Sequence, residues 1–312
     1  MKKLLLVISI LIILCLAAVY IFIPARINVS SSSLASCIPK NVAVPLGDLN
    51  KWREWWPEKK EQPGDSFFYK EYGYKLGNRF TNGAEIELWT GNEKTTSQIV
   101  IIPLGKDSSG VEWKTSFDAG ANPFKKVTQY LKASQLKNDM YEILNHLSDF
   151  ASKTENVYGF HIERTTFTDT ILAATRFSTN GYPTTEIIYN AIDKLKEKIR
   201  REGAEEKDFP MLNVMQTDSN RFETMIAVCI DRLLPGEGNI FISRMVPMKD
   251  RFLKTEVTGG PFAIKNGHIA IESYMNDRFL SAPAIPFEIL VTDRRQETDT
   301  AKWKTTIFYP SM

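Results

Sequence analysis

One carboxylate stands inside an apolar, strand-like segment near the end of the chain, where it could do chemistry. Glu288 lies in the run IPFEILV, residues 285–291. Burying a charged carboxylate costs several kcal/mol unless the group is protonated or paired, so Glu288 should have a partner or a raised pKa. Lys302 and Lys304 on the next predicted strand are candidate partners. Perturbed buried acids gather at functional sites, and Glu288 is therefore a candidate ligand contact.

Aromatic side chains after the glycine turns, on a helix and on the last strand could form the walls of a cavity around this carboxylate. Stacking and cation–π attraction to such rings are worth roughly 0.5–2 kcal/mol each for a flat or cationic ligand. The alternative is that each ring belongs to the hydrophobic core. The candidates are Tyr182, Phe262, Tyr274 and Trp303.

The sequence offers no catalytic pair and no metal-binding pattern. The three histidines, His146, His161 and His268, are dispersed, and none has a base or ligand partner at a recognisable spacing. Three cysteines exclude a disulfide-stapled scaffold and form no zinc motif. We therefore assign no catalytic residue and no metal ligand, and we expect no cofactor.

An internal repeat positions these residues. Residues 174–195 align with residues 254–275, each as a strand, a glycine turn and a helix with an apolar period. A proline-led strand ending in Thr-Asp follows each helix, and a final strand follows that. Counted back from Thr-Asp, Glu288 aligns with Asn213. The two repeats therefore differ at the position where a ligand would be recognised. A strand–helix–strand–strand unit that occurs twice predicts one α+β domain with a pseudo-two-fold axis.

This doubled unit, together with the strand PFEILVTD and the ending Lys302-Trp303…Tyr309-Pro310, resembles the GyrI-like small-molecule-binding domain, the effector domain of AraC-type and multidrug-responsive regulators. The resemblance covers residues 158–312. It implies an aromatic-lined cavity between the repeats, with Glu288 receiving a cationic ligand. Some relatives resemble hydrolases that open strained rings with a glutamate and an aromatic hydroxyl, a role that Glu288 and Tyr274 could fill.

The region before this repeat predicts a helix-grip fold. An extended segment at 27–36 precedes a helix over residues 42–57, an antiparallel meander over 67–117 and a long amphipathic helix that ends near Ser152. With the segment Asn50-Lys51-Trp52…Trp55-Trp56-Pro57, residues 27–155 resemble the START-like (SRPBCC) superfamily, particularly its membrane-anchored bacterial members. The resemblance implies an apolar cavity under the long helix, whereas the three tryptophans taken alone indicate core packing.

The amino-terminal segment is apolar enough to span a bilayer. The run from Leu4 to Ile23 is interrupted only by Ser9, and twenty residues match the ~30 Å hydrocarbon core. It is longer than the apolar region of a signal peptide and has no small-residue cleavage site at its end. Cys15 invites a lipoprotein interpretation, but the bulky Leu14 before it disagrees. We expect an uncleaved anchor over residues 1–24.

The flanking lysines favour an amino terminus on the cytoplasmic side and the bulk of the chain outside the cytoplasm. A net charge of +2 over 312 residues argues against a nucleic-acid partner, and the chain offers no helix-turn-helix candidate. We therefore expect a membrane-anchored protein that binds, senses or sequesters a small hydrophobic or cationic compound. The alternatives are a hydrolase acting in the same cavity and an interaction scaffold whose cavities are filled by side chains.

Overall fold

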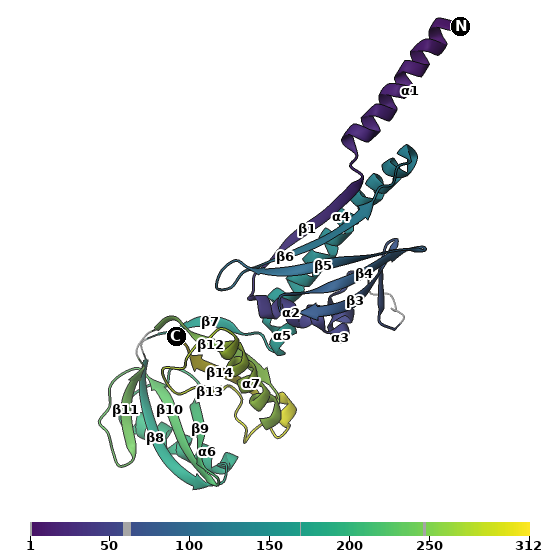
Figure 1. The fold of residues 1–312 in the computed structure, drawn as a ribbon. Coiled ribbons are helices and arrows are strands. Elements are labelled where there is room, and N and C mark those ends of the chain that lie inside the picture. The colour runs from purple at the N-terminus through teal and green to yellow at the C-terminus, as the bar shows by residue number, and fades with distance from the viewer. Residues whose placement is uncertain (1, 59–63, 169, 246–247) are drawn as a thin grey trace. The chain divides into compact units, whose positions relative to one another are not determined.

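The computed structural model describes residues 2–58, 64–168, 170–245 and 248–312, which form two compact units that divide between Lys153 and Thr154 (Figure 1). Each unit combines helices with one antiparallel sheet, and an apolar helix begins the chain. The expected α+β class is therefore confirmed.

The first unit packs a six-stranded sheet, in the order β1-β6-β5-β4-β3-β2, against the long helix α4. Residues of α4 at helical spacing, among them Leu136, Met140 and Leu147, are fully buried in the core of this unit. The elements are α1 (Lys2–Phe22), β1 (Arg26–Ala35), α2 (Pro39–Gly47), α3 (Leu49–Trp55), β2 (Ser66–Tyr69), β3 (Tyr72–Phe80), β4 (Gly83–Thr90), β5 (Glu93–Pro103), β6 (Ser109–Asp118) and α4 (Pro123–Ser152).

The apolar segment at the amino terminus folds as the single helix α1. Within the described residues it is the one helix that is long and apolar enough to cross a membrane, with a mean hydropathy of 3.2 over its most apolar window. None of that window is buried against the rest of the protein. Near its end Val19 packs against the core of the first unit, whereas most of the other side chains of α1 are exposed.

The single helix that we expected over residues 42–57 is wrong, because Asp48 divides it into α2 and α3. The backbone of Asp48 is extended, at φ −113° and ψ 110°, and its carboxylate accepts a hydrogen bond from the amide of Asn50. This is the geometry of a helix N-cap, which favours a new start over continuation. The indoles of Trp52 and Trp56 then stack at 5.2 Å inside the core.

The second unit has an eight-stranded antiparallel sheet whose order, β11-β8-β10-β9-β13-β14-β12-β7, reads symmetrically outward from the β9–β13 pair. The predicted repeats are β8-α6-β9-β10 and β12-α7-β13-β14, and an edge strand, β11 or β7, extends each half. The elements are α5 (Thr154–Tyr158), β7 (Glu163–Phe167), β8 (Thr170–Asn180), α6 (Thr185–Arg201), β9 (Met211–Asp218), β10 (Arg221–Ile230), β11 (Ile240–Met245), β12 (Met248–Thr258), α7 (Pro261–Asp277), β13 (Phe287–Leu290), the 3-10 turn η1 (Thr300–Lys302) and β14 (Lys304–Pro310).

Helices α6 and α7 pack on one face of this sheet, α6 on β8 and β10, and α7 on β12 and β14. Gly267 lets α7 approach closely, because a Cβ there would lie 2.7 Å from Val257 and 2.8 Å from Ile307. The next residue, His268, is brought to the sheet surface by this close contact.

Replacing Gly267 with alanine tests this packing, because the sign of the change in the free energy of unfolding shows whether a methyl group fits there. Alanine is a better helix former than glycine by about 1 kcal/mol, so an open site would become more stable. We expect the opposite, a loss of about 1–3 kcal/mol in the free energy of unfolding, because the methyl group overpacks the helix–sheet contact. Urea unfolding of the full chain in detergent measures it. The neighbouring Asn266→Ala is the control, and a stabilised Gly267→Ala variant would contradict the close approach.

Candidate functional site

Glu288 lies on β13, with only 9% of its surface exposed, and its carboxylate contacts one imidazole and one guanidinium. Nε2 of His268 on α7 is 3.2 Å from Oε1, and the guanidinium of Arg294 donates to Oε2 at 3.3 Å. The expectation that Glu288 has a charged partner is met, but by these two residues in place of Lys302 or Lys304. His268 showed no partner at a recognisable spacing in the sequence, and the structure brings it to Glu288, which lies 20 residues away on another element.

His268 continues the network toward the edge of the sheet. Its Nδ1 is 2.9 Å from the hydroxyl of Tyr309 on β14, and that hydroxyl donates to Glu272 of α7 at 2.9 Å. Tyr309 therefore lies between His268 and Glu272 and joins both side chains of α7 to β14. Burial and the nearby Glu272 raise the pKa of Tyr309, which keeps the phenol neutral.

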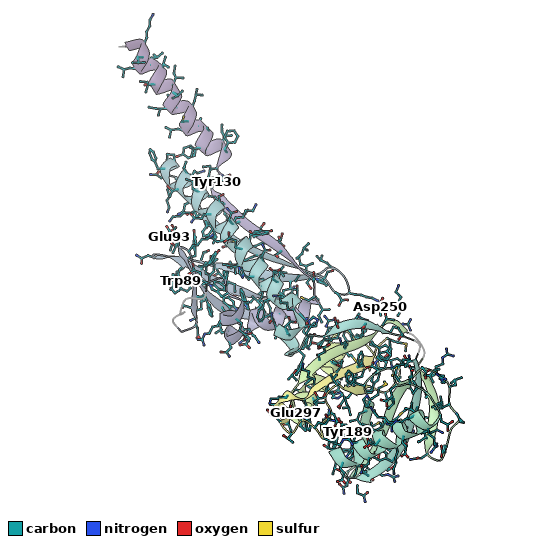
Figure 2. The ribbon with its side chains drawn as sticks, turned by 180° about the vertical axis from the view of Figure 1, so that it is seen from behind. Trp89, Glu93, Tyr130, Tyr189, Asp250 and Glu297 are labelled. Carbon is teal, nitrogen blue, oxygen red and sulfur yellow. The ribbon has the colours of Figure 1, made fainter. Side chains whose placement is uncertain are left out.

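Arg294 is fixed from several sides in the loop after β13. Its guanidinium also donates to Thr305 at 3.0 Å and lies over the ring of Trp303, 4.9 Å from the centroid. The hydroxyl of Tyr189, a residue of α6 labelled in Figure 2, accepts from the backbone amide of Arg294 at 2.8 Å. Trp303 therefore contacts the Glu288 network through Arg294.

The other aromatic candidates lie at different places. Tyr182 packs edge-on to Phe222, and its pKa is raised to about 12, first by desolvation and then by the charge of Glu288. More than half of its surface, 58%, is exposed. Tyr274 is buried and contacts Tyr158 and Arg278, whereas Phe262 is 78% exposed at the start of α7.

A separate cavity of about 280 Å³ lies on the other face of the same sheet. Phe287 and Glu288 are consecutive in β13, so their side chains point to opposite faces, Phe287 into the cavity and Glu288 toward the helices. The lining is mostly apolar and includes three methionines, which adapt readily to irregular shapes. The lining residues are Leu172, Met211, Leu212, Asn213, Met225, Ala227, Ser243, Arg244, Met245, Phe252, Ala284, Ile285, Phe287 and Pro310.

Three polar residues reach this apolar cavity, and Asn213 is one of them. Its side-chain amide donates to the carbonyl of Pro286 at 2.8 Å, which ties β9 to the segment before β13. Ser243 and Arg244 are contributed by β11. The sequence pattern pointed to Asn213 through the repeat alignment, but the methionines carry no pattern that separates a cavity wall from an ordinary core.

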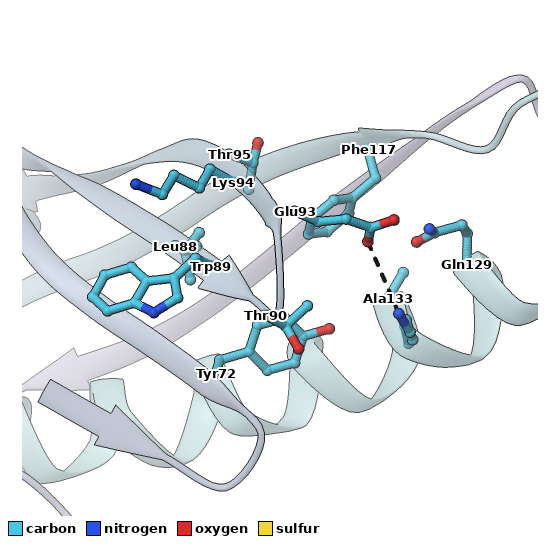
Figure 3. Close-up of a pocket in the computed structure, with 11 residues that line it drawn as sticks. Tyr72, Leu88, Trp89, Thr90, Glu93, Lys94, Thr95, Phe117, Gln129 and Ala133 are labelled. Carbon is cyan, nitrogen blue, oxygen red and sulfur yellow. Dashed lines mark ion pairs between the residues drawn. The ribbon is translucent and has the colours of Figure 1, made fainter.

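The pocket beside α4 in the first unit is much smaller, at about 40 Å³ (Figure 3). Tyr72, Trp89, Phe117 and Ala133 line it, and Lys132 on α4 reaches Glu93 at 3.9 Å across its mouth. That volume holds a few water molecules and no drug-sized ligand. The assignment of residues 27–155 to the START-like superfamily stays a prediction.

Comparison with known proteins gives distant structural likenesses and no match among family models or curated sequences. The EcmrR C-terminal domain, a GyrI-like effector-binding fold, matches 49% of this chain and 98% of its own, with 15% identity and a TM-score of 0.40. A hydrolase from Listeria innocua matches 48% and 91%, with 12% identity and a TM-score of 0.38. The Aha1 dimer from Colwellia psychrerythraea matches 40% and 96%, with 11% identity and a TM-score of 0.32. Function must therefore be argued from the sites of this chain.

Glu288→Gln keeps the shape of the side chain and removes the charge that Arg294 and His268 share. We expect the free energy of unfolding to fall by about 2–4 kcal/mol, because a largely buried guanidinium loses its counter-charge. The double variant Glu288→Leu/Arg294→Met removes both charges and should be more stable than the single variant. Urea unfolding followed by near-ultraviolet circular dichroism measures both, and a Glu288→Gln protein as stable as the unmodified chain would sink this account of the pair.

Proposed function

We propose that this chain is a membrane-anchored protein whose second unit binds a small hydrophobic molecule in the 280 Å³ cavity. The observation that carries the proposal is the lining of this cavity, in which Met211, Met225, Met245, Phe252 and Phe287 surround one contiguous space. A volume near the lower end of ligand pockets, ~300–1,000 Å³, suits a compact molecule. The exposed apolar helix α1 supports anchoring of the chain in a bilayer.

The chemistry of the cavity favours a hydrophobic ligand over a cationic one. Glu288, which the sequence suggested as the counter-charge for a cation, faces the helices and is already paired with Arg294 and His268. A cationic ligand would have to displace one of these partners, and the polar groups at the cavity are an amide, a hydroxyl and a guanidinium. An apolar molecule with a hydrogen-bond acceptor near Asn213 or Arg244 fits this set.

Binding, with sensing or sequestration as its consequence, is favoured over hydrolysis because the pair that a hydrolase would use is not assembled. Tyr274 packs with Tyr158 and Arg278, and the hydroxyl that joins the Glu288 network belongs to Tyr309. The hydrogen-bond contacts connect Tyr309 to Glu288 through His268. This arrangement stabilises the fold of the second unit between its helices and its sheet.

Filling the cavity tests the proposal. The full chain in nanodiscs is titrated with the neutral dye N-phenyl-1-naphthylamine, with empty nanodiscs as the background. Met225→Trp occupies the cavity and should weaken binding at least about tenfold, because the ligand loses the apolar surface that it would bury. Met215→Trp, on the exposed part of β9, is the matched control and should bind like the unmodified chain.

Two further dyes separate the ligand classes in the same assay. Rhodamine 6G carries a positive charge and 8-anilinonaphthalene-1-sulfonate a negative one. One contrary result is that rhodamine 6G binds more tightly than the neutral dye, loses its affinity in Glu288→Gln and keeps it in Met225→Trp. That result would contradict binding in the cavity and would place the ligand beside Glu288 on the helix face. Equal binding of the neutral dye by all variants would remove the cavity from the function.

A further inference from the structure

The first three turns of α4 expose an apolar face to solvent. Phe124 is 81% exposed and Leu131 is 64% exposed, and Val127 and Tyr130 lie between them on the same side of the helix. The spacing 124, 127, 131 places these side chains opposite Gln129 and Ala133, which are buried against the first unit. We call Phe124, Val127, Tyr130 and Leu131 the apolar face of α4.

Hydrogen bonds hold this part of α4 beside the end of the apolar helix α1. The hydroxyl of Tyr20 donates to the carbonyl of Ala121 at 2.6 Å, just before α4 begins. The buried ammonium of Lys126 donates to the carbonyl of Ile23 at 2.7 Å and lies over the ring of Tyr20. Figure 2 shows Tyr130 near the end of α1 that leads into the first unit. The start of α4 is therefore at the level of Tyr20.

The charge of the same segment suits an anionic surface. Residues 123–137 contain Lys125, Lys126, Lys132 and Lys137 and no acidic residue. Cations in the first turn of a helix oppose the helix dipole, so they are unfavourable for α4 taken alone. The bond to Ile23 accounts for Lys126, at the carbonyl end of α1, whereas Lys125 is exposed next to Phe124. A lysine near an anionic bilayer gains about 1 kcal/mol.

We propose that the apolar face of α4 docks into the headgroup region of the bilayer that α1 spans, with anionic phospholipid as its partner. The inference rests on the membrane anchoring in the proposed function. Tyr20 is the type of residue that sits at a membrane–water interface, and its bond to Ala121 places Phe124 at that depth. Exposed apolar residues with flanking lysines, held at this level, match the composition of interfacial helices.

Site-directed spin labelling of the full chain in vesicles of phosphatidylcholine and phosphatidylglycerol tests the docking. Cys15 is replaced with alanine, and Cys37 and Cys229 are buried, so single labels are introduced by Phe124→Cys and Leu131→Cys. Tyr141→Cys, on the same helix and about 15 Å beyond Leu131, is the matched exposed control. Ile12→Cys reports on α1 itself.

The readout is the accessibility of each label to oxygen, which concentrates in lipid, relative to a water-soluble nickel chelate. We expect this ratio to be several-fold higher at 124 and 131 than at 141, and highest at 12. A lipid-exposed label at 12 with equal ratios at 124, 131 and 141 would overturn the docking and leave the anchor intact. A water-exposed label at 12 would overturn both.

Discussion

The pairing of β9 with β13 is the contact on which the second unit depends. Leu212 lies opposite Glu288 and Met211 opposite Ile289, and this short antiparallel ladder joins two repeats that each hold only part of a sheet. The side-chain amide of Asn213 adds a bond to the carbonyl of Pro286 across the same seam. The β9–β13 pairing therefore makes one continuous eight-stranded sheet out of two four-stranded halves.

Strand β13 also separates the polar Glu288 network on the helix face of the sheet from the apolar cavity on the other face. Because successive side chains of a strand alternate between faces, Glu288 points to the helices and Phe287 to the cavity. The helix face can accept a carboxylate because Arg294 pairs with it there and His268 lies within hydrogen-bond distance. The other face is then free of buried charge from β13, and it forms the apolar wall of the cavity. Glu288, which the sequence suggested as a ligand contact, is thus held by side chains of the protein itself.

The helix α4 has a comparable double role in the first unit. Its buried stripe closes the core against the sheet, while its first turns hold the end of α1 through Lys126 and carry the exposed apolar face. Buried tryptophans fill the interior of this unit. The first unit therefore has a tightly packed interior, and its pocket of about 40 Å³ is much smaller than the cavity of about 280 Å³ in the second unit.

Local sequence determined the parts of this protein that depend on neighbours along the chain. The sequence predicted the apolar helix α1, the helical period of α4, the strand–helix–strand–strand repeats and the unusual position of Glu288 in an apolar strand. Each of these predictions depends on the order and spacing of residues along the chain. The break at Asp48 was missed because a side-chain cap competes with a continuing helical period. His268, Arg294 and Tyr309 were joined to Glu288 only by the tertiary fold, as they come from three different elements. The tertiary structure also decided on which face of the sheet the cavity lies. The register between paired strands sets which side chains share a face, and register cannot be read from one segment alone.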